Sequence, residues 1–93
     1  VEGNTDKITL TIDKNLKLRV HLDRLKASKL VSRITGLDSN PEYMADLCKT
    51  LKQKCGVGGS VKDGEILIQG DQVNKIVDYL HSIGFKNAKR SGG

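Results

Sequence analysis

The dipeptide Asp63-Gly64, placed between two short runs of β-forming residues, is the feature that most constrains the fold of this chain. An Asp-Gly pair readily adopts positive φ angles at both positions and joins antiparallel strands through a two-residue turn. The run before it covers residues 60–62, and the run after it covers residues 65–69. The sequence therefore predicts a β-hairpin in its second half.

Apolar residues alternate with polar ones in the first half of the chain, which is the period expected of half-buried strands. Residues 30–34 have β-forming character and follow a turn predicted at residues 25–28. We expect them to pair with the preceding strand as a second hairpin. The alternating residues are Ile8, Leu10, Ile12, Leu16, Leu18, Val20 and Leu22.

An amphipathic helix is predicted over residues 41–54, because apolar residues recur there at spacings of three and four. Pro41 suits the first turn, Ser39 and Glu42 match a capping box, and Gly56 ends the helix. The residues on its apolar face are Met44, Leu47, Cys48, Leu51 and Cys55.

A second helix is predicted after Gly70, with Asp71 able to cap it and Gly84 placed to end it. Its apolar face consists of Val73, Ile76, Val77, Leu80 and Ile83. Residues 85–90 are long enough to form a short final strand.

The predicted order is β-β-α-β-β-α with a final strand added where residues 85–90 form one. Helices on one face of an antiparallel sheet of four to five strands give a two-layer α+β sandwich. One Phe, two Tyr and no Trp require a mainly aliphatic core. We expect one domain over residues 16–93, preceded by a segment, residues 1–15, that is either flexible or an extra strand.

Positive charge is concentrated in three clusters that contain no acid. The chain has 16 Lys and Arg against 11 Asp and Glu, a net charge of +5, which favours polyanionic partners. Such clusters predict a surface that holds RNA phosphates, although solvated lysines on amphipathic faces would produce the same pattern. The clusters are Arg24, Lys26, Lys29 and Arg33; Lys49, Lys52, Lys54 and Lys62; and a secondary cluster of Lys86, Lys89 and Arg90.

The segment Gly56-Val57-Gly58-Gly59-Ser60 between a helix and a strand has two interpretations. Glycine there permits a left-handed helix end and a tight entry into the strand. It would also let the backbone approach RNA closely, so Gly56, Gly58 and Gly59 are candidate RNA contacts. The segment lacks the Gly-Lys-Ser/Thr ending of a nucleotide-binding P-loop.

No constellation in the sequence supports catalysis or metal binding. His21 alternates with leucines in a strand and His81 falls on the polar side of a helix, and neither has a nucleophile beside it. Cys48 and Cys55 match no zinc spacing and stand too far apart on a helix for a disulfide, which favours a reducing compartment. We therefore expect no cofactor, no metal and no enzyme activity. The sequence has no run long enough to span a membrane.

Residues 54–71, KCGVGGSVKDGEILIQGD, closely resemble the signature of the SUI domain family, which comprises eukaryotic translation initiation factor one and its archaeal and bacterial relatives. Residues 18–24, LRVHLDR, residues 34–36, ITG, and residues 89–93, KRSGG, resemble the bacterial, YciH-like branch. One difference lies in the first hairpin, where Leu25, Ala27 and Ser28 replace a loop that is usually glycine-rich and basic in bacterial relatives.

The resemblance implies a cytoplasmic, monomeric translation initiation factor that binds the small ribosomal subunit near the peptidyl site. Its partners would be ribosomal RNA, the initiator transfer RNA region and other initiation factors. In the family, the basic loop of the first hairpin and the face of the first helix approach RNA, which here means residues 24–29 with Arg33, and Lys49, Lys52 and Lys54. The expected mechanism is phosphate binding with steric competition for the decoding site. Two alternatives remain open, a stress-time repressor of initiation and a protein-interaction module.

Overall fold

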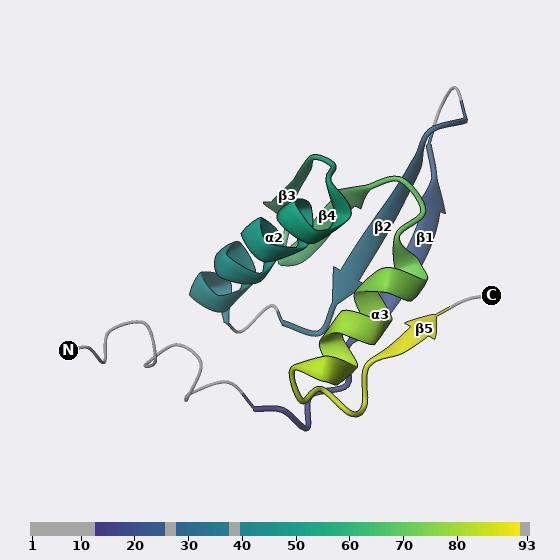
Figure 1. Cartoon of the computed structure of the whole chain (residues 1–93). Helices are drawn as coiled ribbons and strands as arrows, with labels where there is room; N and C mark the ends of the chain where they lie inside the picture. The colour runs from purple at the N-terminus through teal and green to yellow at the C-terminus, as the bar shows by residue number, and fades with distance from the viewer. Residues whose placement is uncertain (1–12, 26–27, 38–39, 92–93) are drawn as a thin grey trace.

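Two helices cover one face of a five-stranded sheet in the computed structural model, which describes residues 13–25, 28–37 and 40–91 (Figure 1). The strands lie in the order β3-β4-β2-β1-β5, with α2 over β3 and β4 and α3 over β1 and β5. The predicted α+β sandwich is confirmed, whereas the expectations for residues 1–12 lie outside the described residues. The elements are β1 (Arg19–Arg24), β2 (Leu30–Thr35), α2 (Pro41–Cys55), β3 (Gly59–Lys62), β4 (Glu65–Gln69), α3 (Val73–Ser82) and β5 (Lys89–Ser91).

The sheet is mixed, which differs from the antiparallel sheet that the sequence predicts. β5 pairs in parallel with β1, with Arg19 opposite Lys89 and His21 opposite Ser91. The other pairs, β1 with β2, β2 with β4 and β3 with β4, are antiparallel. The physical reason is that α3 carries the chain back along the sheet after β4, so that β5 runs in the same direction as β4 and β1.

The predicted turn and helix end are both confirmed. Asp63 and Gly64 have φ angles of 52° and 76°, and Lys62 stands opposite Glu65 in the hairpin. Gly56 ends α2 in the left-handed region at φ 67°, where its N–H donates to the Lys52 carbonyl at 2.9 Å. Positive φ favours glycine, as at Gly56 and Gly64, and Asp is among the few other residues that adopt it.

α2 begins at Pro41 as predicted, but the residues at the N-cap positions of both helices differ from the sequence prediction. The N-cap position of α2 is Asn40, whose carbonyl accepts from the Met44 N–H at 3.0 Å, while Ser39 lies outside the described residues. The N-cap position of α3 is Gln72 and not Asp71. The Gln72 N–H donates to Ser32 Oγ at 2.8 Å, so a buried side chain from β2 holds the backbone at the start of α3.

The core lies between the helix-covered face of the sheet and the two helices, and it is mainly aliphatic as predicted. Phe85 is fully buried, and its ring centroid lies 6.0 Å from that of Tyr43. Lys14 places its Nζ 4.7 Å from the Phe85 centroid and donates to the Ile83 carbonyl at 2.6 Å, which ties the start of the described chain to the end of α3. Other core residues are Leu18, Val20, Ile34, Leu47, Leu51, Ile66, Ile68, Ile76 and Leu80.

Candidate nucleic-acid interface

The strand directions bring the first hairpin and the end of α2 to the same end of the sheet. β1 ends and β2 begins there, and β4 ends beside them, since Gly70 N–H donates to the Leu30 carbonyl at 2.8 Å. The chain leaving α2 reaches the same place, because Gln69 N–H donates to the Gly58 carbonyl at 3.0 Å. We call this the tip end; it comprises residues 24–25, 28–30, 52–58 and 69–75. The opposite end, with the turn between Lys62 and Glu65, is the far end.

Four predicted phosphate-binding residues lie at the tip end. Arg24 and Lys29 flank the hairpin tip and are exposed. Lys52 and Lys54 belong to the last turn of α2, where a positive charge also interacts favourably with the helix dipole. Lys26 lies outside the described residues.

Lys75 in the first turns of α3 adds a cation that the sequence reading missed. Its positive charge acts on the Cys55 thiol at the end of α2, which places the two helix ends close together. Burial nevertheless dominates at Cys55 and raises the pKa of that thiol. Lys75 belongs to none of the charge clusters in the sequence, so only the packing of α3 beside α2 reveals it.

The three lysines of α2 do not form one row. A Cβ at Gly59 would stand 3.3 Å from Lys52 Cγ, so Lys52 lies against β3. Lys54 lies on the other side of the helix, with its Nζ 4.9 Å from the Tyr79 ring centroid on α3. Lys49 is exposed one turn before Lys52. The resemblance implied one RNA-binding face of α2, but Lys52 and Lys54 point to different neighbours, β3 and α3.

Arg33 lies on the uncovered face of the sheet and is engaged by two carboxylates. Its Nε donates to Asp23 Oδ2 at 2.7 Å, and its Nη1 donates to Glu65 Oε2 at 3.0 Å. The bond to Asp23 contributes most to raising the pKa of the guanidinium. The sequence shows no acid between residues 24 and 33, yet the pairing of β2 with β1 and β4 brings one from each side.

The remaining predicted cations lie away from the tip end. Lys62 precedes the turn at the far end, and Lys86 follows α3, which also ends there. Lys89 and Arg90 lie on opposite faces of β5, because Lys89 stands opposite Arg19 and Arg90 opposite the buried Val20. The secondary cluster of the sequence is therefore dispersed in space.

The family model for translation initiation factor SUI1 matches residues 14–86. The chain belongs to the SUI1 family. This SUI1 domain is 37% identical over 71 residues to a protein translation factor SUI1 homolog of Methanosphaera stadtmanae, covering 76% of this chain and 70% of that protein. It is 38% identical over 69 residues to a homolog of the same name from Thermococcus gammatolerans, covering 74% and 70%.

A bacterial relative supports the expected branch. The SUI1 domain is 48% identical over 63 residues to an uncharacterized protein of Haemophilus influenzae, covering 68% of this chain and 58% of that protein. The predicted membership in the bacterial, YciH-like branch is confirmed. The SUI1 family is one of translation factors and not of enzymes.

Two glycines of the SUI1 signature have structural reasons for being glycine. A Cβ at Gly59 would stand 2.6 Å from the Leu67 carbonyl oxygen and 2.8 Å from Ile68 Cδ1, so β3 can approach β4 only without one. Gly56 has open space around it and is favoured by its left-handed φ. Gly56 and Gly59 therefore have structural reasons to be glycine whether or not they contact RNA. The RNA contacts expected at Gly56, Gly58 and Gly59 stay predictions.

Within the described ranges, the SUI1 domain contains no group of three or more His, Cys, Asp or Glu that could hold a metal ion. His21 Nε2 lies 3.3 Å from Thr35 Oγ1, and His81 Nε2 lies 2.7 Å from the Ala88 carbonyl oxygen. Cys48 is buried, Cys55 is partly buried, and both thiols are free. Among the residues placed by the structure, no helix is long and apolar enough to cross a membrane.

Proposed function

We propose that this SUI1 domain is a cytoplasmic, monomeric translation initiation factor that binds the small ribosomal subunit near the peptidyl site. It would influence the selection of the start codon and the initiator transfer RNA. The observation that carries the proposal is that the first hairpin and the ends of two helices gather cations at the tip end. These cations are Arg24, Lys29, Lys52, Lys54 and Lys75.

Phosphate groups of ribosomal RNA are the partners that suit this arrangement. Lysine and arginine side chains spread over several elements can each neutralise one phosphate without reading base sequence. Two acids lie near these cations: Asp23 is paired with Arg33, and Asp71 is exposed at the tip end, where its charge offsets one of the five cations. The tip end would thus fix the position of the domain on RNA.

The hairpin tip would then act by occupying space. Leu25 is half exposed beside the tip, and its apolar side chain cannot bind a phosphate. With the cations holding phosphates, a correctly paired initiator would displace the tip, and a mispaired one would not compensate for the lost contacts. Discrimination by competition for space requires no covalent step.

Co-sedimentation with isolated ribosomal subunits tests the proposal. We expect binding to small and not to large subunits, weakened at least tenfold by the Lys52→Ala, Lys54→Ala double variant because two phosphate contacts are lost. Lys17→Ala removes an exposed charge near the far end and serves as the control. Equal binding to both subunits, or no binding at low salt, would contradict the proposal.

A reconstituted initiation assay separates the proposed role from the two alternatives. Rejection of near-cognate start codons with cognate ones unaffected supports selection, whereas uniform inhibition indicates a repressor. Retention of a single protein partner in material freed of RNA indicates an interaction module.

A further inference from the structure

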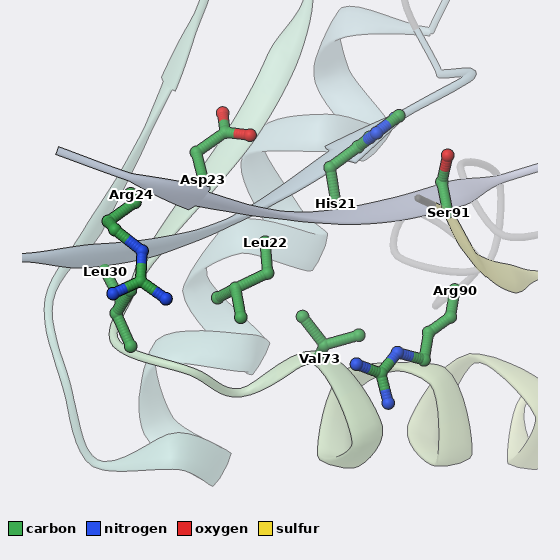
Figure 2. Close-up of a pocket in the computed structure, with 8 residues that line it drawn as sticks. All are labelled: His21, Leu22, Asp23, Arg24, Leu30, Val73, Arg90 and Ser91. Atoms are coloured by element: carbon green, nitrogen blue, oxygen red, sulfur yellow. The ribbon is translucent and has the colours of Figure 1, made fainter. Parts of the chain in front are cut away.

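A cavity of about 400 Å³ lies on the helix-covered side of the sheet, beside the point where α3 begins (Figure 2). β1 continues past the first residue of α3, Val73, so the helix leaves the last residues of β1 uncovered. Leu22 is consequently 37% exposed, although it points to the same side as the fully buried Val20. The lining residues are His21, Leu22, Asp23, Arg24, Leu30, Val73, Arg90 and Ser91.

The cavity has an apolar floor and two guanidinium groups. Figure 2 shows Leu22 and Val73 facing each other, with the Arg24 and Arg90 side chains on the same side of the strand. His21, Asp23 and Ser91 point to the opposite side of the sheet, so they contribute backbone to the lining. Sequence reading assigned Arg24 and Arg90 to separate clusters, and the parallel pairing of β5 with β1 brings them to one cavity.

Among the residues that the structure places, Arg24 and Arg90 have no acid as an ion-pair partner. Arg90 Nη1 donates to Asn74 Oδ1 at 3.3 Å, which holds the guanidinium beside α3 without cancelling its charge. The carboxylate of Asp23 is directed to Arg33 on the other face.

The spacing of the arginines suits a ligand that is longer than a single phosphate. Arg90 stands opposite Val20, which lies four residues before Arg24 on the same strand, a distance of about 13 Å along the strand. Two long side chains directed over the intervening Leu22 can approach the ends of one ligand. A volume of about 400 Å³ falls within the range of small-molecule sites.

We propose that this cavity binds one unpaired nucleotide of an RNA strand, with a phosphate on an arginine fork and the base packed on the exposed Leu22. Guanidinium groups match phosphate oxygens bidentately and also stack on bases, and protein sites for single-stranded RNA commonly combine both contacts. The inference rests on the proposed function, because it names a nucleotide subsite next to the tip end.

Fluorescence anisotropy with a labelled six-adenosine RNA tests the subsite. Arg24→Ala and Arg90→Ala should each weaken binding about tenfold, and the double variant should lose less than the product of the two, because the arginines share one ligand. Leu22→Ala should weaken binding to this RNA but not to an abasic hexamer. The control is Lys17→Ala, which should change the affinity less than twofold.

Three results would overturn the subsite. These are strictly multiplicative effects of the two arginines, an equal effect of Leu22→Ala on both RNAs, and displacement of the RNA by a six-residue acidic peptide at comparable concentration. Circular dichroism confirms folding of each variant, and Leu22→Asn supplies a second test if Leu22→Ala unfolds. Subunit co-sedimentation is independent of this assay, so wild-type protein that binds the hexamer but not small subunits would refute the proposed function and leave the subsite intact.

Discussion

Arg33 Nε lies 2.7 Å from Asp23 Oδ2 across the β1–β2 pair, on the face of the sheet that the helices leave uncovered. The same guanidinium reaches Glu65 on β4, so one side chain connects three neighbouring strands. An arginine fork presents donors on separate nitrogens to the two carboxylates, whereas a lysine would have to reach both with a single ammonium group. Arg33 is therefore better suited to holding the sheet together than to binding phosphate.

Arg33→Ala should lower the free energy of unfolding by about 1 kcal/mol, because two partly exposed ion pairs are lost. Its effect on RNA affinity should be smaller than that of Arg24→Ala. Urea unfolding measures the first quantity and RNA anisotropy the second. Arg33→Lys should recover only part of the stability, and a variant as stable as wild type would show that the bridge contributes nothing.

Ser32→Ala should destabilise the domain by about 1–3 kcal/mol, since Ser32 is fully buried and its hydroxyl serves two backbone groups. Its Oγ donates to the Gly70 carbonyl and accepts from the Gln72 N–H, each at 2.8 Å. Removing the hydroxyl leaves the Gly70 carbonyl and the Gln72 N–H without their bond to Ser32, at the point where α3 begins. Urea denaturation gives the measurement, with the exposed Ser60→Ala as the matched control; equal midpoints would contradict the assignment.

Gly59→Ala should cost about 1–3 kcal/mol, because its Cβ would stand 2.6 Å from the Leu67 carbonyl oxygen, which belongs to the backbone of β4. Gly56→Ala should cost only about 1 kcal/mol, from the left-handed φ alone. Thermal unfolding of the two variants compares these causes. A less stable Gly56→Ala would mean that conformation and not close packing controls this connection.

The stability of the domain should fall in alkali because of the buried Tyr43. Burial raises the pKa of Tyr43 to about 12, with the nearby Tyr79 and Asp46 adding to the effect. Between the unfolded pKa near 10 and the folded value, the native state binds more protons, so the free energy of unfolding decreases as the pH rises. Tyr43→Phe lacks this contribution and should lose less stability than wild type between pH 10 and 11.5 in urea melts. Parallel losses in the two proteins would contradict it.

The secondary structure was accessible from sequence because its signals are local. The period of two from Leu18 to Leu22, the three-and-four spacing of α2 and the Asp63-Gly64 turn each depend on a few adjacent residues. The parallel pairing of β5 was not accessible, since it joins Lys89 to Arg19 across most of the chain. The start of α3 depends in the same way on a distant residue, because Ser32 on β2 accepts from the Gln72 N–H.

The candidate site was predictable only in part. The cations of the hairpin and of α2 were found as runs of charge, and antiparallel pairing placed them at one end. Runs of charge do not reveal which acids lie alongside, so they could not show that Arg33 is paired with Asp23 and Glu65. Runs of charge also could not show that Arg24 and Arg90 line one cavity or that Lys75 lies near the end of α2. Both depend on packing between segments that are distant in the sequence.

The salt dependence of small-subunit binding tests the central claim most directly. With the five tip-end cations each neutralising one phosphate, log affinity should fall against log salt with a slope of about −3.5 to −4.5. The triple variant Arg24→Ala, Lys29→Ala, Lys52→Ala should reduce the magnitude of that slope by about 2–3, while Lys17→Ala leaves it unchanged. A flat response for the wild type, or the same slope for the triple variant, would show that the tip end does not hold ribosomal RNA phosphates.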